Sequence, residues 1–218
     1  MENMRNDKSH VLIVIFPAQG HINPSLQLSK RLIDLVIYVA FGSYTETSSQ
    51  LMEEIGQGLL KCGRPFLWVI REGQNRKNLT CKDELEKKGK LVSWCSQAEV
   101  LKHPSVGCFL THCGWNSTLE SIASGVPVVA CPIWNDQLCN AKLVQDVWKN
   151  GVRVNIGDKG IAERDEFERC IEIVMGNSEE GGKLRNNVKK WSNLAKEAMK
   201  KNGSSVMNLK TYANEFFI

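Results

Sequence analysis

Residues 106–132, "VGCFLTHCGWNSTLESIASGVPVVACP", decide the fold. The stretch holds an apolar run that ends at His112, a helical pattern that is closed by Gly125, and a second apolar run rich in valine. A continuous apolar run is typical of a strand that is buried on both faces of a parallel sheet. A strand, a helix and a strand in this order predict a βαβ unit.

The same alternation extends in both directions from this unit. Helices are expected at 47–62, which begins with Thr and Ser residues suited to capping, at 97–103 and 116–124, and at 136–150, which Gly151 closes. Residues 72–90 are polar and expected to be irregular, and the sequence after residue 156 has a helical pattern. The pattern predicts an α/β protein with a doubly wound, Rossmann-like parallel sheet. Its strands are expected at 36–41, 65–70, 90–95, 106–112, 126–132 and 152–156.

Several polar or aromatic residues follow these strands directly. Ser43, the Trp94–Cys95 pair and His112 each stand where an expected strand ends. In doubly wound sheets, ligands bind beyond the carboxyl ends of the strands. We therefore expect these residues to gather at one rim of the sheet.

The corner after the strand at 106–112 has the features of an anion site. His112 can donate a hydrogen bond to a phosphate oxygen, and Gly114 allows the backbone to approach a ligand closely. Asn116 and Ser117 stand at a helix start, where free backbone N–H groups and the helix dipole favour negative charge. The alternative is that Asn116 or Ser117 simply caps the helix.

Other side chains extend this corner towards a larger ligand. Glu120 lies one turn into the same helix, where its carboxylate can accept hydrogen bonds from both hydroxyls of a ribose. Trp94 offers a flat face for a base, and Asp136 and Gln137 are suited to sugar hydroxyls. A base platform, a diol acceptor, an anion corner and a sugar clamp together indicate a nucleotide sugar. The only near match to the dinucleotide pattern, "GQGLLK" at 56–61, lies inside an expected helix and lacks the third glycine.

The 44 residues from Trp94 to Gln137, "WCSQAEVLKHPSVGCFLTHCGWNSTLESIASGVPVVACPIWNDQ", resemble the donor-binding signature of plant family 1 UDP-glycosyltransferases. The resemblance covers residues 36–218 and returns in "FPAQGHINP" near the N-terminus. It implies the GT-B fold, in which two Rossmann-like domains face each other. The N-terminal domain takes the acceptor and the C-terminal domain takes the UDP-sugar.

The resemblance also implies a role for each matching residue. Trp94 is expected to stack on uracil, with Cys95 and Gln97 near the base and ribose. Glu120 is expected to hold the ribose hydroxyls. The remaining donor contacts are expected from Ser43, His112, Asn116 and Ser117 on the diphosphate and from Trp115, Asp136 and Gln137 on the sugar, with Gln137 favouring glucose.

His21 matches the catalytic base of the family. It is expected to take a proton from the acceptor hydroxyl while that oxygen attacks the anomeric carbon and displaces UDP with inversion. The resemblance implies no cofactor and no metal ion, with UDP-glucose as the donor substrate. The acceptor is expected to be a small plant molecule of flavonoid, anthocyanin or phenolic type.

The chain departs from the family at residues 35 and 36, where an expected helix runs into an expected strand without a turn residue. We interpret 1–35 as a strand–loop–helix remnant of the N-terminal domain and 36–218 as the C-terminal domain. The missing part would carry an Asp that pairs with His21 and most of the acceptor pocket. Transfer is then expected to be weak or absent. Two questions stay open: whether the chain is a non-catalytic UDP-sugar-binding fragment, and whether 11–16 pairs with 36–41 as an extra strand.

The composition of the chain limits its possible partners and its cellular compartment. The net charge of +4 over 218 residues is too small to indicate nucleic-acid binding. The eight cysteines contain no C-x-x-C pair, which indicates core residues in a reducing compartment rather than disulfides or a metal site. The longest N-terminal apolar run, "VLIVIF", is too short for a signal peptide or a membrane span. We expect a cytoplasmic monomer.

Overall fold

The computed structural model describes residues 35–42, 45–71, 79–158 and 160–216. Leu35–Ile218 forms one compact unit. Residues 1–34 of the expected strand–loop–helix at 1–35 lie outside the described residues, as do the expected base His21 and the diphosphate residue Ser43.

The described chain contains a six-stranded sheet in which every neighbouring pair of strands is parallel. The spatial order is β3-β2-β1-β4-β5-β6, so the order reverses between β1 and β4. This is the topological switch point at which doubly wound sheets bind ligands. The predicted α/β, doubly wound class is confirmed. The strands are β1 (Val36–Ala40), β2 (Phe66–Val69), β3 (Lys90–Val92), β4 (Val106–Thr111), β5 (Val128–Ala130) and β6 (Gly151–Arg153).

Strand β1 lies inside the sheet, with a partner on each edge. Ile37 is in register with Phe66 of β2 on one side and with Cys108 of β4 on the other. Both hydrogen-bonding edges of β1 are therefore occupied. Residues 11–16, whose pairing with 36–41 the sequence left open, lie outside the described residues.

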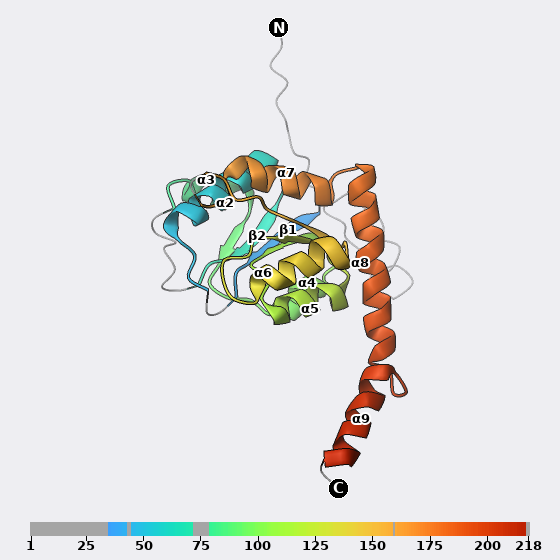
Figure 1. The fold of residues 1–218 in the computed structure, drawn as a ribbon. Helices are drawn as coiled ribbons and strands as arrows, with labels where there is room; N and C mark the ends of the chain where they lie inside the picture. The colour runs from blue at the N-terminus through green and yellow to red at the C-terminus, as the bar shows by residue number, and fades with distance from the viewer. Residues whose placement is uncertain (1–34, 43–44, 72–78, 159, 217–218) are drawn as a thin grey trace, which may run out of the picture. The chain divides into compact units, whose positions relative to one another are not determined.

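Helices cover both faces of the sheet (Figure 1). One face carries α2 (Ser49–Cys62), α3 (Lys82–Lys88) and α7 (Arg164–Met175). The opposite face carries α4 (Gln97–Lys102), α5 (Trp115–Ser124) and α6 (Gln137–Lys142), which continues as the π-helix η2 (Leu143–Val147). Two further helices follow α7 along the chain: α8 (Glu179–Ala198) and α9 (Ser204–Phe216).

The alternation of side chains along β1 builds two cores. Ile37 and Val39 point into the larger core with α2 and α7, and both are fully buried. Tyr38 and Ala40 point the other way, where the ring of Tyr38 stacks on Phe109 at a centroid distance of 5.0 Å. Because both faces of the strand are buried, the sequence of β1 is apolar throughout.

A close helix contact fixes α2 against α7. A Cβ atom on Gly58 would lie 2.7 Å from Cβ of Phe167 and 2.9 Å from the carbonyl oxygen of Arg164. Only glycine therefore fits at this point of the α2 surface.

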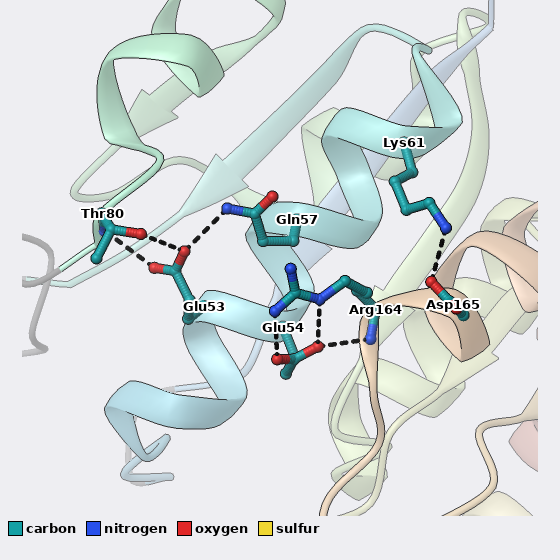
Figure 2. A network of polar contacts seen from close by, with 7 residues as sticks. All are labelled: Glu53, Glu54, Gln57, Lys61, Thr80, Arg164 and Asp165. Carbon is teal, nitrogen blue, oxygen red and sulfur yellow. Dashed lines mark hydrogen bonds and ion pairs between the residues drawn. The ribbon is translucent and has the colours of Figure 1, made fainter.

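Polar contacts surround the same helix pair (Figure 2). The guanidinium of Arg164 donates to both carboxylate oxygens of Glu54, at 3.0 and 2.8 Å. Nearer the end of α2, Nζ of Lys61 donates to Asp165 at 2.7 Å. These pairs tie the start of α7 to α2.

The structure corrects two of the expected elements. Helix α3 lies within 72–90, where irregular structure was expected; its early Asp83 and Glu84 and late Lys87 and Lys88 suit the helix dipole, and Leu85 is buried. The helix expected at 136–150 ends as η2 at Val147. Gly151 therefore opens β6 instead of closing that helix, because Lys149, with φ of 50°, already turns the chain.

The strands expected at 90–95, 126–132 and 152–156 are shorter in the structure, at Lys90–Val92, Val128–Ala130 and Gly151–Arg153, whereas two helix ends lie where they were expected. Ser48 caps α2 by accepting a hydrogen bond from the Leu51 N–H at 3.2 Å. Gly125 ends α5 in the left-handed conformation, with φ of 73°. Local capping signals therefore placed both helix ends.

Candidate functional site

His112 stands at the end of β4 and is held between two glycines. A Cβ atom on Gly42, which follows β1, would lie 2.7 Å from Nε2 of His112, and one on Gly114 would lie 2.6 Å from the same nitrogen. The segments that follow the two strands on either side of the switch point therefore each place a glycine against Nε2 of the imidazole. The side chain is only 7% exposed.

This burial keeps His112 neutral. It lowers the pKa of His112 to about 4, although the negative charge of Asp136 opposes the shift. Oγ1 of Thr111 lies 3.3 Å from Nδ1 of His112. When this hydroxyl donates to Nδ1, the neutral ring carries its proton on Nε2, the nitrogen that lies between the two glycines. His112 is then a hydrogen-bond donor at the switch point.

The backbone after His112 turns sharply into helix α5. Cys113 has φ of 62°, which is rare for a residue with a side chain, and Gly114 caps the helix without a side-chain hydrogen bond. By helix geometry the N–H groups of Trp115, Asn116 and Ser117 have no carbonyl partner within α5. The alternative that Asn116 or Ser117 is the N-cap is therefore wrong. The helix presents its positive end beside His112.

Gln97, at the start of α4, reaches across to α5. Its Nε2 donates to Oγ of Ser117 at 3.0 Å and to Oε2 of Glu120 at 2.8 Å. The structure thus brings together Gln97, Ser117 and Glu120, three of the residues that were expected near the ribose and the diphosphate. Ser117 is almost buried, and its hydroxyl accepts from Gln97 while keeping its own proton to donate.

Trp94 and Cys95 follow β3 on the same side of the sheet. The Trp94 side chain is 68% exposed, so its indole face is open to a ligand. Sγ of Cys95 lies 3.5 Å from the hydroxyl of Tyr38. Burial raises the pKa of Tyr38, so this phenol stays protonated. Trp115 and Asn116 are also exposed, at the start of α5.

Two of the three residues expected on the sugar, Asp136 and Gln137, point in different directions. Gln137 is 4% exposed, and its Oε1 accepts from the N–H groups of Ile133 and Trp134 at 2.9 and 3.1 Å. Its Nε2 donates to Oγ1 of Thr45 at 3.4 Å. Gln137 therefore holds the loop after β5 and joins it to the segment after β1. Asp136 is exposed and faces solvent.

Sequence reasoning missed four residues of this region: Gly42, Thr45, Thr111 and Asn140. Asn140 lies four residues after Asp136 on the same helix, a spacing at which side chains meet, so this one was within reach of the sequence. The contacts of the others join segments that are distant in sequence or depend on how an imidazole ring is turned.

A cleft of about 370 Å³ lies elsewhere, between η2, β6, α7 and α8, and its lining includes Lys149 and Arg153. This cleft is the weaker candidate for an anion site, because two further cations that line it, Arg169 and Lys183, are already paired. Arg169 is bound by Glu166 at 2.6 Å, and Lys183 pairs with a glutamate at 2.7 Å. The glycine-lined corner at the switch point is therefore the better candidate for the ligand site.

No group of three or more His, Cys, Asp and Glu side chains that could hold a metal ion occurs in the part of the chain that the structure describes. None of the helices described is long and apolar enough to cross a membrane.

Comparison with known proteins identifies the family. The family model described as "UDP-glucoronosyl and UDP-glucosyl transferase" matches residues 33–201. The chain belongs to this family. Its resemblance to plant UDP-glycosyltransferases, expected from the signature at 94–137, is confirmed by the curated relatives.

Two of these relatives are plant proteins. UDP-glycosyltransferase 75C1 of Solanum lycopersicum is 56% identical over 180 residues, which cover 81% of this chain and 38% of the relative. The anthocyanidin 3-O-glucoside 5-O-glucosyltransferase of Verbena hybrida is 57% identical over 182 residues, which cover 83% of this chain and 40% of the relative. The chain thus spans about two-fifths of the length of the relatives it matches.

Solved structures agree with this family membership. The crystal structure of Os79 from O. sativa in complex with UDP superposes with a TM-score of 0.80 at 40% identity, covering 87% of this chain and 42% of Os79. A structure of Phytolacca americana UGT2 with UDP-2fluoro-glucose and pterostilbene superposes with a TM-score of 0.76 at 39% identity, covering 83% of this chain and 41% of UGT2. The expected GT-B class is confirmed.

Proposed function

We propose that residues 36–218 form the donor domain of a UDP-glycosyltransferase that transfers glucose from UDP-glucose to a hydroxyl or carboxyl group of a small plant molecule, of flavonoid, anthocyanin or phenolic type. The observation that carries the proposal is the corner at the switch point. There His112 is held between Gly42 and Gly114, beside the open N-terminus of α5. Such a corner suits a diphosphate.

The surrounding residues supply the rest of a UDP-sugar site. Uracil stacks on the exposed Trp94, and the ribose hydroxyls donate to Glu120, which Gln97 orients through a 2.8 Å hydrogen bond. The sugar lies towards Asp136. Gln137 contributes by fixing the loop that carries Asp136.

In the reaction, the diphosphate corner stabilises the leaving group. As the bond between the anomeric carbon and the diphosphate oxygen breaks, negative charge grows on the diphosphate. The Nε2–H of His112 and the N–H groups at the start of α5 donate to it. Because these donors are fixed before the reaction begins, they need little rearrangement when charge develops.

The acceptor side depends on His21. His21 takes the proton of the acceptor hydroxyl while that oxygen attacks the anomeric carbon from the face opposite UDP. The new glycosidic bond takes the electron pair of the oxygen, and the old bond leaves its pair on UDP, so the configuration inverts. We propose that no metal ion or further cofactor takes part.

A second function is a non-catalytic UDP-sugar-binding protein. The observation in its favour is that the chain covers only 38% and 40% of the two relatives described above. If residues 1–35 are all that corresponds to the acceptor domain, the acceptor pocket and the partner of His21 are missing. Donor binding then persists while transfer is weak or absent.

The cysteines indicate the cellular compartment. All eight cysteines are free, and five of them are buried, which supports a reducing compartment; we propose the cytoplasm. One relative, the crocetin glucosyltransferase of Gardenia jasminoides, is named as chloroplastic. We propose a monomer whose partners are a UDP-sugar and a small acceptor rather than nucleic acid.

Titration calorimetry with UDP-glucose tests the proposal. Wild-type protein should bind, and a Trp94→Ala, Glu120→Ala double variant should not. Each sample is then assayed for UDP release with a mixed flavonoid and phenolic-acid pool. Acceptor-dependent release supports transfer, binding without release supports the non-catalytic function, and the absence of binding refutes the donor site.

A further inference from the structure

Asn140, on α6, is the residue of this region that the proposed function leaves without a role. Its side chain is 5% exposed, and its amide nitrogen makes two hydrogen bonds. One runs to the carbonyl oxygen of Cys113 at 2.9 Å, and the other to Oδ2 of Asp136 at 2.7 Å. A single buried amide therefore touches both the diphosphate corner and the carboxylate expected on the sugar.

The contact with Cys113 falls on the strained point of the corner. Cys113 has φ of 62°, a conformation that costs energy for any residue with a Cβ atom. Such strain persists where the surroundings fix the backbone. Asn140 does so by holding the Cys113 carbonyl, and the direction of this peptide sets the path into Gly114 and the first N–H groups of α5.

The contact with Asp136 orients an otherwise exposed side chain. Asp136 lies at the N-cap position of α6, but no side-chain capping bond holds it there. The hydrogen bond from Asn140 selects one direction for its carboxylate and leaves the other oxygen for a ligand. Without this bond, an exposed carboxylate has several rotamers of similar energy.

We propose that Asn140 is a positioning residue that fixes the sugar-binding carboxylate of Asp136 in place relative to the diphosphate corner. The inference rests on the proposed function, because it assigns these two places to the diphosphate and the sugar. Asn140 itself touches neither. It determines how UDP affinity and sugar recognition are coupled.

The test measures dissociation constants of UDP and of UDP-glucose for the whole chain by calorimetry. The variants are Asn140→Leu, Asp136→Ala and the two combined. Asn140→Leu keeps the branched outline and the number of heavy atoms of the side chain and removes both hydrogen bonds. Asn187→Leu is the matched control, because Asn187 donates at 2.9 Å to the carbonyl of Lys149, which also has a positive φ of 50°, but lies away from the corner.

We expect Asn140→Leu to weaken UDP binding about fivefold or more, since a buried carbonyl loses its partner and the corner relaxes. It should also reduce the affinity for UDP-glucose relative to UDP, as Asp136→Ala does. In the Asp136→Ala background, Asn140→Leu should still weaken UDP but leave that ratio unchanged. Asn187→Leu should bind both nucleotides as the wild type does.

Two results would overturn the inference alone: both dissociation constants of Asn140→Leu within twofold of the wild type, or an equal loss for UDP and UDP-glucose. The second result would make Asn140 a merely structural residue. If Asn140→Leu shows no cooperative thermal transition, Asn140→Ser, which cannot span both contacts, replaces it under the same criteria. Wild-type protein that binds neither nucleotide refutes the proposed function together with the inference.

Discussion

Gly114→Ala is the sharpest perturbation of the diphosphate corner. The added Cβ atom would lie 2.6 Å from Nε2 of His112, and ordinary contact begins at 3.4 Å, so the imidazole has to retreat by about 0.8 Å. Gly114 has φ of −56°, which alanine adopts without strain. The change therefore displaces the buried His112 ring with little effect on the backbone, and we expect this crowding to cost about 1–3 kcal/mol of stability.

The expected loss of affinity follows from that retreat. A hydrogen bond of about 2.9 Å from Nε2 to a phosphate oxygen would lengthen to roughly 3.7 Å, beyond the hydrogen-bonding range. A hydrogen bond to a charged group contributes about 1.5–3 kcal/mol, which corresponds to roughly a 10- to 150-fold weaker binding of UDP. The assay is titration calorimetry with UDP beside a thermal unfolding curve.

Gly125→Ala is the control for this experiment. Gly125 ends the same helix, and the nearest atoms to an added Cβ atom lie at 3.5 Å, on Ser192. We expect it to lower stability and leave UDP binding unchanged. The reasoning is refuted if Gly114→Ala unfolds near the wild-type temperature and binds UDP within twofold of the wild-type affinity.

Three further outcomes are expected. Gly42→Ala should lose about 1 kcal/mol of stability, as Gly125→Ala does, because both glycines have φ of 73°, but it alone should also weaken UDP binding in calorimetry. Burial lowers the pKa of His112 to about 4, so below pH 6.5 the unfolded chain binds a proton at this residue that the folded chain does not. The free energy of unfolding, measured by urea titration, should therefore fall from pH 6.5 to 4. His112→Gln should remove the part of this fall that comes from His112. Gly58→Ala should push α2 off Phe167 and lower the free energy of unfolding by about 1–3 kcal/mol with no change in UDP affinity, which urea titration and calorimetry together will show.

The order of strands and helices was predictable because its signals are local. Apolar runs such as 106–111 and glycines such as Gly125 mark elements wherever the chain folds. Helix α3 was missed because only Leu85 of its seven residues is buried, which leaves little apolar periodicity to read. Gly151 was misread because a glycine after a helix resembles a cap, whereas here it gives room beside Val128 and Val144.

The candidate site also contains some contacts that could be predicted from the sequence and some that could not. The meeting of Gln97, Ser117 and Glu120 was expected from the family resemblance, which assigned these residues to the ribose and the diphosphate. The inward turn of Gln137 and the two contacts of Asn140 arise from packing between segments that are distant in sequence, which no local pattern encodes. The roles of His21 and Ser43 stay predictions, since both lie outside the described residues.

A crystal structure of the chain with UDP tests the central claim most directly. The account predicts uracil on the face of Trp94, the ribose hydroxyls on Glu120, and the diphosphate within hydrogen-bonding distance of Nε2 of His112 and the N–H groups that open α5. A diphosphate bound instead in the cleft beside Arg153, or away from both places, would contradict it.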